Sequence, residues 1–247
     1  MKKVYILPNL FTTASLLLGV LAIFNTLSNG SVGKSIWYIA FAAILDSLDG
    51  KIARITKSES FFGLNYDSLS DLVSFGVAPA VVMYPVLQSL HPKVVRGVLA
   101  FFIICSALRL ARYNVQANKE EKVVFMGLPT PGSAAVVLSY LLFVKAVDVK
   151  ILYMLFPVLI IFTSYLMISS VHYPGFKSIN FRQRSPFQVL VIVTIFVAFL
   201  VALKEYFSFI LFPIIFTYLM VFFGKFLIRK LSKRSLQKED EAVNESI

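Results

Sequence analysis

The chain has 247 residues, of which 58% are hydrophobic and only 15% are charged, and its mean hydropathy is +0.79. A soluble globular domain is closer to half apolar and a quarter charged, so the composition excludes an ordinary soluble enzyme and predicts an all-α integral membrane protein. The net charge of +11 does not indicate a nucleic-acid partner, because apolar stretches separate the basic residues. We interpret these residues as anchors that face the anionic headgroups of a lipid bilayer.

Eight apolar stretches each approach the length of about 20 residues that a helix needs to cross a bilayer. The last two are separated only by a short charged turn at Lys204 and Glu205. In chain order the predicted spans cover residues 10–27, 35–55, 69–90, 94–115, 131–146, 151–171, 187–203 and 206–228.

The distribution of positive charge predicts the orientation of these spans. If the N-terminus is cytoplasmic and the spans alternate, 18 of the 24 Lys and Arg residues fall on the cytoplasmic side. Positive residues are enriched in cytoplasmic loops, so both termini are predicted to be cytoplasmic, with an even number of spans in the cell membrane. The polar tail, residues 231–247, is predicted to be cytoplasmic and disordered.

Four carboxylates are concentrated between the second and third predicted spans. Asp46 and Asp49 are three residues apart, and Asp67 and Asp71 are four apart, so each pair lies on one face if its segment is helical. The polar residues 55–62 between the pairs favour a turn. The two helices can therefore return antiparallel and bring all four carboxylates together at the cytoplasmic end of the bundle.

Carboxylates at membrane depth repel one another and are costly to desolvate, and divalent cations between them would relieve both effects. Hard oxygen ligands suit Mg²⁺, Mn²⁺ or Ca²⁺. Two alternatives stay open at this point. The carboxylates could simply pair with nearby Lys51, Arg54 and Lys57, or they could be the cation sites of an ion-coupled transporter. The transporter is less favoured, because such carriers usually distribute their ionisable groups over several helices.

The spacing D-x2-D-G-x2-A-R-x8-G-x3-D-x3-D, which runs from Asp46 to Asp71, resembles the signature of the CDP-alcohol phosphatidyltransferase family at every specified position. The resemblance implies a membrane enzyme, often a homodimer, that displaces CMP from a CDP-linked lipid with an alcohol. It implies a six-helix catalytic core in residues 1–172. Residues 173–230 would then add two transmembrane helices and a cytoplasmic connecting loop.

Three further stretches, residues 61–80, 107–115 and 125–135, resemble the branch of this family that uses L-serine as the acceptor, the membrane-bound phosphatidylserine synthases. Glycerol 3-phosphate and inositol phosphate remain alternative acceptors. Diacylglycerol and archaeol remain alternative lipid parts of the donor.

The family resemblance also implies roles for individual residues. Two divalent ions, Mg or Mn with Ca also able to bind, would be held by Asp46, Asp49, Asp67 and Asp71, and Asp71 would also act as the base for the serine hydroxyl. The nucleotide would contact Asn9, Thr12, Asp49, Gly50, Ala53, Arg54 and Gly63. By the residues alone, Asn9 and Thr12 could instead cap the first helix, and Arg54 could extend to the membrane interface.

The acceptor site is predicted at the cytoplasmic end of the fourth span. Arg109 and Arg112 lie one helical turn apart, and a guanidinium matches the two oxygens of a carboxylate or phosphate. One could bind the serine carboxylate and the other a lipid phosphate, although both could instead be membrane anchors. Asn114 or Ser68 could accept the serine ammonium. Residues 127–131 predict a turn followed by a helix start, either as a plain connection or as the edge of the alcohol pocket.

Overall fold

The computed structural model describes residues 6–56, 58–117, 127–169, 211–221, 223–224 and 228. All the regular elements in these ranges are helices. They are α1 (Ile6–Leu27), α2 (Val32–Ile55), α3 (Phe61–Asp71), a π-helix η2 (Leu72–Val77), α4 (Ala78–Leu87), α5 (Pro92–Ala117), α6 (Thr130–Val147), α7 (Lys150–Ile168) and a further helix, Leu211–Val221.

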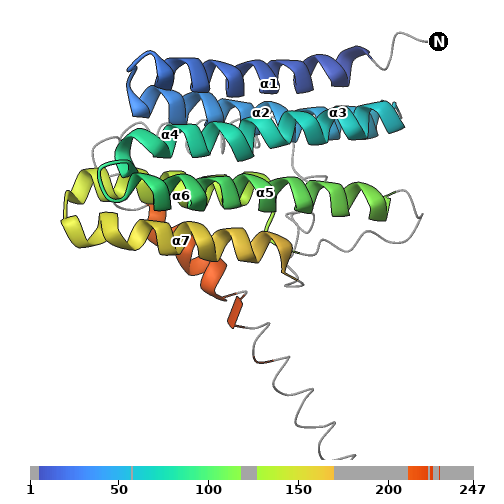
Figure 1. The fold of residues 1–247 in the computed structure, drawn as a ribbon. Coiled ribbons are helices and arrows are strands. Elements are labelled where there is room, and N and C mark those ends of the chain that lie inside the picture. The colour runs from blue at the N-terminus through green and yellow to red at the C-terminus, as the bar shows by residue number, and fades with distance from the viewer. Residues whose placement is uncertain are drawn as a thin grey trace, which may run out of the picture.

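The elements α3, η2 and α4 follow one another without a break and form one long rod, Phe61–Leu87. The described helices from α1 to α7 therefore make a bundle of rods that run side by side in alternating directions (Figure 1). The first rod, α1, packs against α2 and the α3–α4 rod, whereas α5 packs against that same rod and α7. The helix Leu211–Val221 lies on α6, where the ring of Phe212 is 4.6 Å from that of Tyr140.

Five of these rods are long and apolar enough to cross a membrane: α1, Phe61–Leu87, Pro92–Gln116, α6 and α7. With 24 residues, α2 is as long as they are, but its second half carries the charged part of the motif. The predicted all-α membrane protein is thus confirmed. The count of six core spans plus two stays a prediction, because residues 187–203 lie outside the described residues and only part of 206–228 is described.

The buried face of α1 is made of small and weakly polar residues, whereas its large apolar side chains, such as Leu17 and Phe24, are exposed. This is the pattern expected in a bilayer, where lipid solvates the large apolar groups and small residues let helices approach closely. The buried residues recur every three or four positions: Pro8, Thr12, Ser15, Gly19, Ala22 and Thr26.

The close approach of α1 to the third rod depends on this face. A methyl group added at Gly19 would lie 2.8 Å from the Cα atom of Ser74 in η2, so glycine is needed there. The hydroxyl of Ser74 donates to the carbonyl oxygen of Ser15 at 3.1 Å, and Ser15 Oγ donates to the carbonyl of Ala42 in α2 at 3.0 Å. These contacts align the two helices that carry the carboxylates against the same side of α1.

Among the helices from α1 to α7, the starts of the first and third rods differ most from the predicted spans. The first helix already includes Ile6, four residues before the predicted span. The third rod begins at Phe61, eight residues before the predicted position 69, because Ser60 caps it and accepts a hydrogen bond from the backbone N–H of Gly63 at 3.0 Å. The turn between α2 and α3 is therefore shorter than expected, and both carboxylate pairs are helical.

Candidate active site

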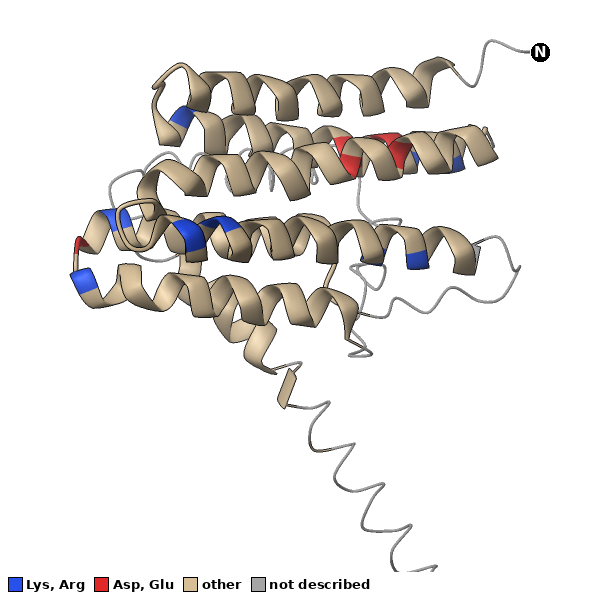
Figure 2. Ribbon diagram, viewed as in Figure 1, with Lys and Arg blue, Asp and Glu red and all other residues tan. Residues whose placement is uncertain are grey.

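The carboxylates of α2 and α3 converge in the interior of the bundle. One oxygen from each of Asp46, Asp49 and Asp67 lies within 4.8 Å of the others, and we call these three residues the carboxylate triad. Asp71, one turn further along α3, lies beside Asp46 and Asp67. Figure 2 shows the acidic residues of the two helices side by side. The helical spacing of the motif thus puts each pair on one helix face, and the packing of α2 and α3 on α1 brings the two faces together.

Two oxygens of this cluster are left without a donor. Asp49 and Asp71 are buried, with exposed fractions of 5% and 9%, and Oδ1 of both Asp67 and Asp71 has no hydrogen-bond partner within the described part of the chain. Buried carboxylate oxygens without donors are destabilising, and a divalent cation is the ligand that would satisfy several of them together. The donor set therefore fits a metal ion that prefers oxygen.

Simple ion pairing with the neighbouring basic residues accounts poorly for the cluster. Lys51 and Arg54 are both exposed, and the Nε atom of Arg54 turns back to donate to the carbonyl oxygen of Gly50 at 2.8 Å. The other basic neighbour, Lys57, lies outside the described residues.

Thr12 links α1 directly to the triad. Its hydroxyl donates to Oδ2 of Asp49 at 2.6 Å, and its backbone carbonyl accepts from the hydroxyl of Ser70 in α3 at 3.2 Å. The alternative that Asn9 and Thr12 cap the first helix is wrong, because the helix includes Ile6 and both residues lie inside it. Sequence reasoning missed the contact with Asp49, since nothing in the local pattern pairs positions 12 and 49.

The residues predicted to contact the nucleotide surround the same end of α2 and α3. A methyl group added at Gly50 would meet only Nη2 of Arg54, at 3.8 Å, so packing within the chain does not require glycine there. The corresponding methyl at Gly63 would lie 3.5 Å from Oδ1 of Asn9. Ala53 is half-buried one turn beyond Asp49. Gly50 lowers the stability of α2 without a packing reason, and this is consistent with close approach of a ligand to the helix.

The two arginines of α5 have different surroundings. Arg109 is half-buried, its Nη1 donates to the hydroxyl of Thr130 at 2.6 Å, and its charge lies near Asp71 and Asp46. Its Nε atom is buried and has no hydrogen-bond partner among the described residues. Sequence reasoning placed Thr130 in a turn that could form the edge of the alcohol pocket, but it did not pair this residue with Arg109.

Arg112 instead holds the end of α7. Its guanidinium donates to the carbonyl oxygens of Ile168 at 2.9 Å and of Met167 and Ser169 at 3.4 Å. A cation at these terminal carbonyls is favourable, because they have no partner within the helix. The predicted turn is confirmed beside this contact: Gly127 has a φ of +82°, and α6 begins at Thr130.

Ser68 and Asn114 also meet. The hydroxyl of Ser68 donates to Oδ1 of Asn114 at 2.9 Å, and Nδ2 of Asn114 donates to Oδ1 of Asn65 at 3.3 Å. These bonds join α3 to α5 on the side of Asp67. Sequence reasoning missed Asn65 as a member of this hydrogen-bond network, because the motif leaves its position unspecified.

The bundle and its carboxylates define an all-helical membrane protein with a polar site suited to divalent cations. The sequence comparison is more specific. Residues 5–174 match the CDP-alcohol phosphatidyltransferase family, and the chain belongs to that family. Members of this family are enzymes that use divalent metals, so the transporter alternative is not favoured.

Several curated relatives are similar over most of their length. The CDP-diacylglycerol–serine O-phosphatidyltransferase of Helicobacter pylori is 36% identical over 197 residues, which cover 77% of this chain and 81% of the relative. The protein of the same name from Methanocaldococcus jannaschii is 34% identical, with 72% and 78% covered. The archaetidylserine synthase of Methanothermobacter thermautotrophicus is 34% identical, with 68% and 69% covered.

Proposed function

We propose that this chain transfers the phosphatidyl group of a CDP-linked lipid to L-serine and releases CMP. The observation that carries the proposal is the carboxylate cluster, set on the family motif, with the half-buried Arg109 near it. The relatives named for serine support this acceptor, and their names include both a diacylglycerol and an archaetidyl form. The lipid part of the donor is therefore left open between these two.

The metal site is assigned to Asp46, Asp49 and Asp67, with Asp71 at its edge. Two bound divalent ions, Mg or Mn with Ca also able to bind, would neutralise the diphosphate and stabilise the attacking and leaving oxygens. Thr12 orients Asp49 for this role through its 2.6 Å hydrogen bond. The cytidine and ribose are assigned to the surface near Gly50, with contacts from Asn9, Thr12, Asp49, Ala53, Arg54 and Gly63.

Asp71 is assigned as the general base. A base must reach the hydroxyl proton of serine, and Asp71 has a buried Oδ1 without a donor beside the triad. In the proposed reaction the serine oxygen forms a bond to the β-phosphorus, the bond from this phosphorus to the CMP oxygen breaks, and the proton passes to Asp71. In-line positioning of these groups supplies much of the rate enhancement of phosphoryl transfer.

Arg109 is assigned to the serine carboxylate. It lies near Asp71, and the hydroxyl of Thr130 holds its Nη1 atom. We leave Arg112 out of direct contact with serine, because its guanidinium already donates to three carbonyl oxygens of α7. Ser68 and Asn114 are assigned to the ammonium group, for which their oxygens are acceptors.

The remaining assignments concern the whole protein. We place both termini and the active site on the cytoplasmic side, as the distribution of positive charge favours, because serine and CMP are soluble metabolites. We retain residues 1–172 as the catalytic core, 173–230 as an added helix pair and 231–247 as a disordered tail. A homodimer is also part of the proposal.

The test is an assay of the purified protein in liposomes that contain a CDP-linked lipid with Mg²⁺ or Mn²⁺. Serine, glycerol 3-phosphate and inositol phosphate are compared as acceptors, and CMP and the lipid product are measured. Of the three acceptors, only serine should release CMP above background. Asp67→Asn should abolish this release without unfolding the protein. CMP release with a phosphorylated alcohol but not with serine would refute the acceptor and leave the family reaction intact.

A further inference from the structure

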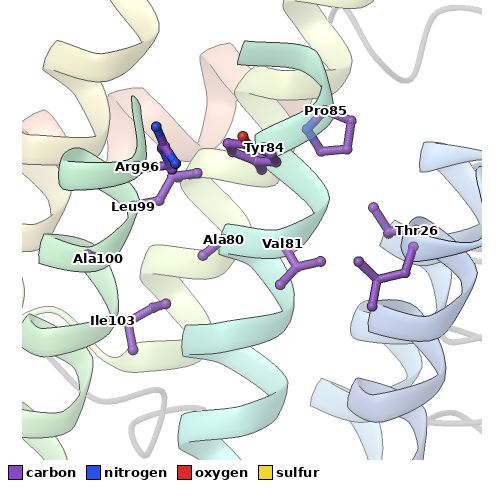
Figure 3. A pocket seen from close by; sticks show the side chains of 10 residues that line it. Thr26, Ala80, Val81, Tyr84, Pro85, Arg96, Leu99, Ala100 and Ile103 are labelled. Atoms are coloured by element: carbon purple, nitrogen blue, oxygen red, sulfur yellow. The ribbon is translucent and has the colours of Figure 1, made fainter. Parts of the chain in front are cut away.

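A cavity of about 330 Å³ lies between α1, α4 and α5, at the opposite end of the bundle from the carboxylates. Its volume falls in the range of about 300–1,000 Å³ that is typical of ligand sites. Figure 3 shows that apolar side chains such as Val81 and Ile103 form its walls, with Tyr84 and Arg96 toward one end. That end is near the boundary of the bilayer, because α4 ends at Leu87 and α5 begins at Pro92.

This end of the bundle is positively charged. Helices α2, α5 and α7 begin here and α6 ends here, and their first or last turns carry most of the basic side chains away from the active site. These cations would meet the headgroups of the leaflet opposite the carboxylates, and among them only Arg96 lines the cavity. They are Lys34, Lys93, Arg96, Lys145 and Lys150, against the single described carboxylate Asp148 at this end.

We propose that the cavity binds one acyl chain of an anionic phospholipid from this leaflet, with the lipid phosphate at Arg96. The Nε atom of Arg96 donates to the carbonyl oxygen of Pro92 at 3.2 Å, which holds the guanidinium near the cavity mouth. A guanidinium offers paired donors to phosphate oxygens. The small side chains of Ala80 and Ala100 leave room for the chain, and the bound lipid fills the gap between α1 and the α4–α5 pair.

The test uses the full chain in a neutral detergent. Dioleoyl phosphatidylglycerol and dioleoyl phosphatidylcholine are titrated separately, and the thermal unfolding midpoint is measured. The anionic lipid should raise the midpoint in a saturable manner, and the zwitterionic lipid should not. Arg96→Gln should weaken the apparent affinity about fivefold, as expected for one cation at a lipid surface. Lys150→Gln removes the same charge at the same end but away from the cavity, and should leave the affinity unchanged.

A second variant tests the cavity itself. Ala100 lines the cavity and is exposed, so Ala100→Phe adds bulk on the cavity wall without disturbing the core, and it should abolish the stabilisation. Equal losses in Arg96→Gln and Lys150→Gln, or full stabilisation of Ala100→Phe, would overturn the proposal. Loss of the effect in Asp67→Asn would place the lipid in the active site instead. Efficient cross-linking of two chains through Ala100→Cys in liposomes would show that a second copy covers the cavity.

Discussion

Removal of the Thr12 hydroxyl is the sharpest test of how the metal site is built. Thr12→Val keeps the shape of the side chain but deletes the donor to Oδ2 of Asp49, which lies 2.6 Å away. Both residues are buried, with exposed fractions of 4% and 5%. The backbone carbonyl of Thr12 still accepts from Ser70, so the packing of α1 on α3 is retained.

The magnitude follows from the kind of hydrogen bond that is lost. A hydrogen bond to a charged group contributes about 1.5–3 kcal/mol. Each 1.4 kcal/mol changes an equilibrium constant about tenfold, so the metal concentration for half-maximal activity should rise roughly 10–100-fold. The same range is typical when a residue that orients a metal ligand is lost. Activity at saturating metal should fall much less, because Asp49 itself remains.

The assay measures CMP release against Mn²⁺ concentration, together with the metal-dependent shift of the unfolding midpoint. Thr13→Val is the matched control, since it removes a neighbouring hydroxyl whose partners in the described part of the chain are the carbonyl of Asn9 and the hydroxyl of Tyr66. Thr12→Ser keeps the donor and should restore the metal midpoint. An unchanged metal midpoint in Thr12→Val would refute the reasoning. A loss of CDP-lipid affinity at saturating metal would then indicate a direct nucleotide contact.

Three other predictions test separate parts of the chain. Asp71→Asn should lower turnover by about 10²–10⁴-fold, the usual contribution of a general base, with little change in CDP-lipid affinity; a large loss of that affinity would make Asp71 a metal ligand instead. Gly127→Ala should destabilise the fold by about 1–3 kcal/mol, because φ is +82° and the added methyl would clash with the carbonyl of α7. Gly132→Ala, inside α6, should be neutral or slightly stabilising in the same unfolding experiment. Equal unfolding midpoints for the Gly127→Ala and Gly132→Ala variants would contradict the predicted backbone strain at Gly127. In a background without the native cysteine, an impermeant thiol reagent added outside cells should label Lys34→Cys but not Lys51→Cys, and the reverse pattern would invert the topology.

The acidic motif shows how far local pattern can lead. Because side chains three or four positions apart share a helix face, the spacing of Asp46, Asp49, Asp67 and Asp71 is enough to predict two facing pairs. The family resemblance in the sequence rests on the same positions, and the family match covers residues 5–174. The fold class follows equally directly from composition, since a chain this apolar must satisfy its backbone groups within helices when it enters a bilayer.

Helix starts were harder to place. Hydropathy put the beginning of the third rod at residue 69, because the first turns of α3 include Asn65 and Asp67 and are not apolar enough to be assigned to a membrane span. The helix nevertheless starts at Phe61, where Ser60 supplies the cap. Capping and packing against α1 sustain a polar helical segment that average hydropathy does not detect.

The division of roles between Arg109 and Arg112 marks the limit of the sequence. The chain by itself determined that this is a helical membrane protein, where its carboxylates lie, and that two arginines stand one turn apart at the same end of α5. Only the tertiary structure directed Arg109 toward Thr130 and the carboxylates, and Arg112 toward the end of α7. The hydrogen bond from Thr12 to Asp49 and the cavity between α1, α4 and α5 also become visible only in the tertiary structure. Helical periodicity specifies which residues share a face, but the partner of that face depends on how rods distant in sequence pack together.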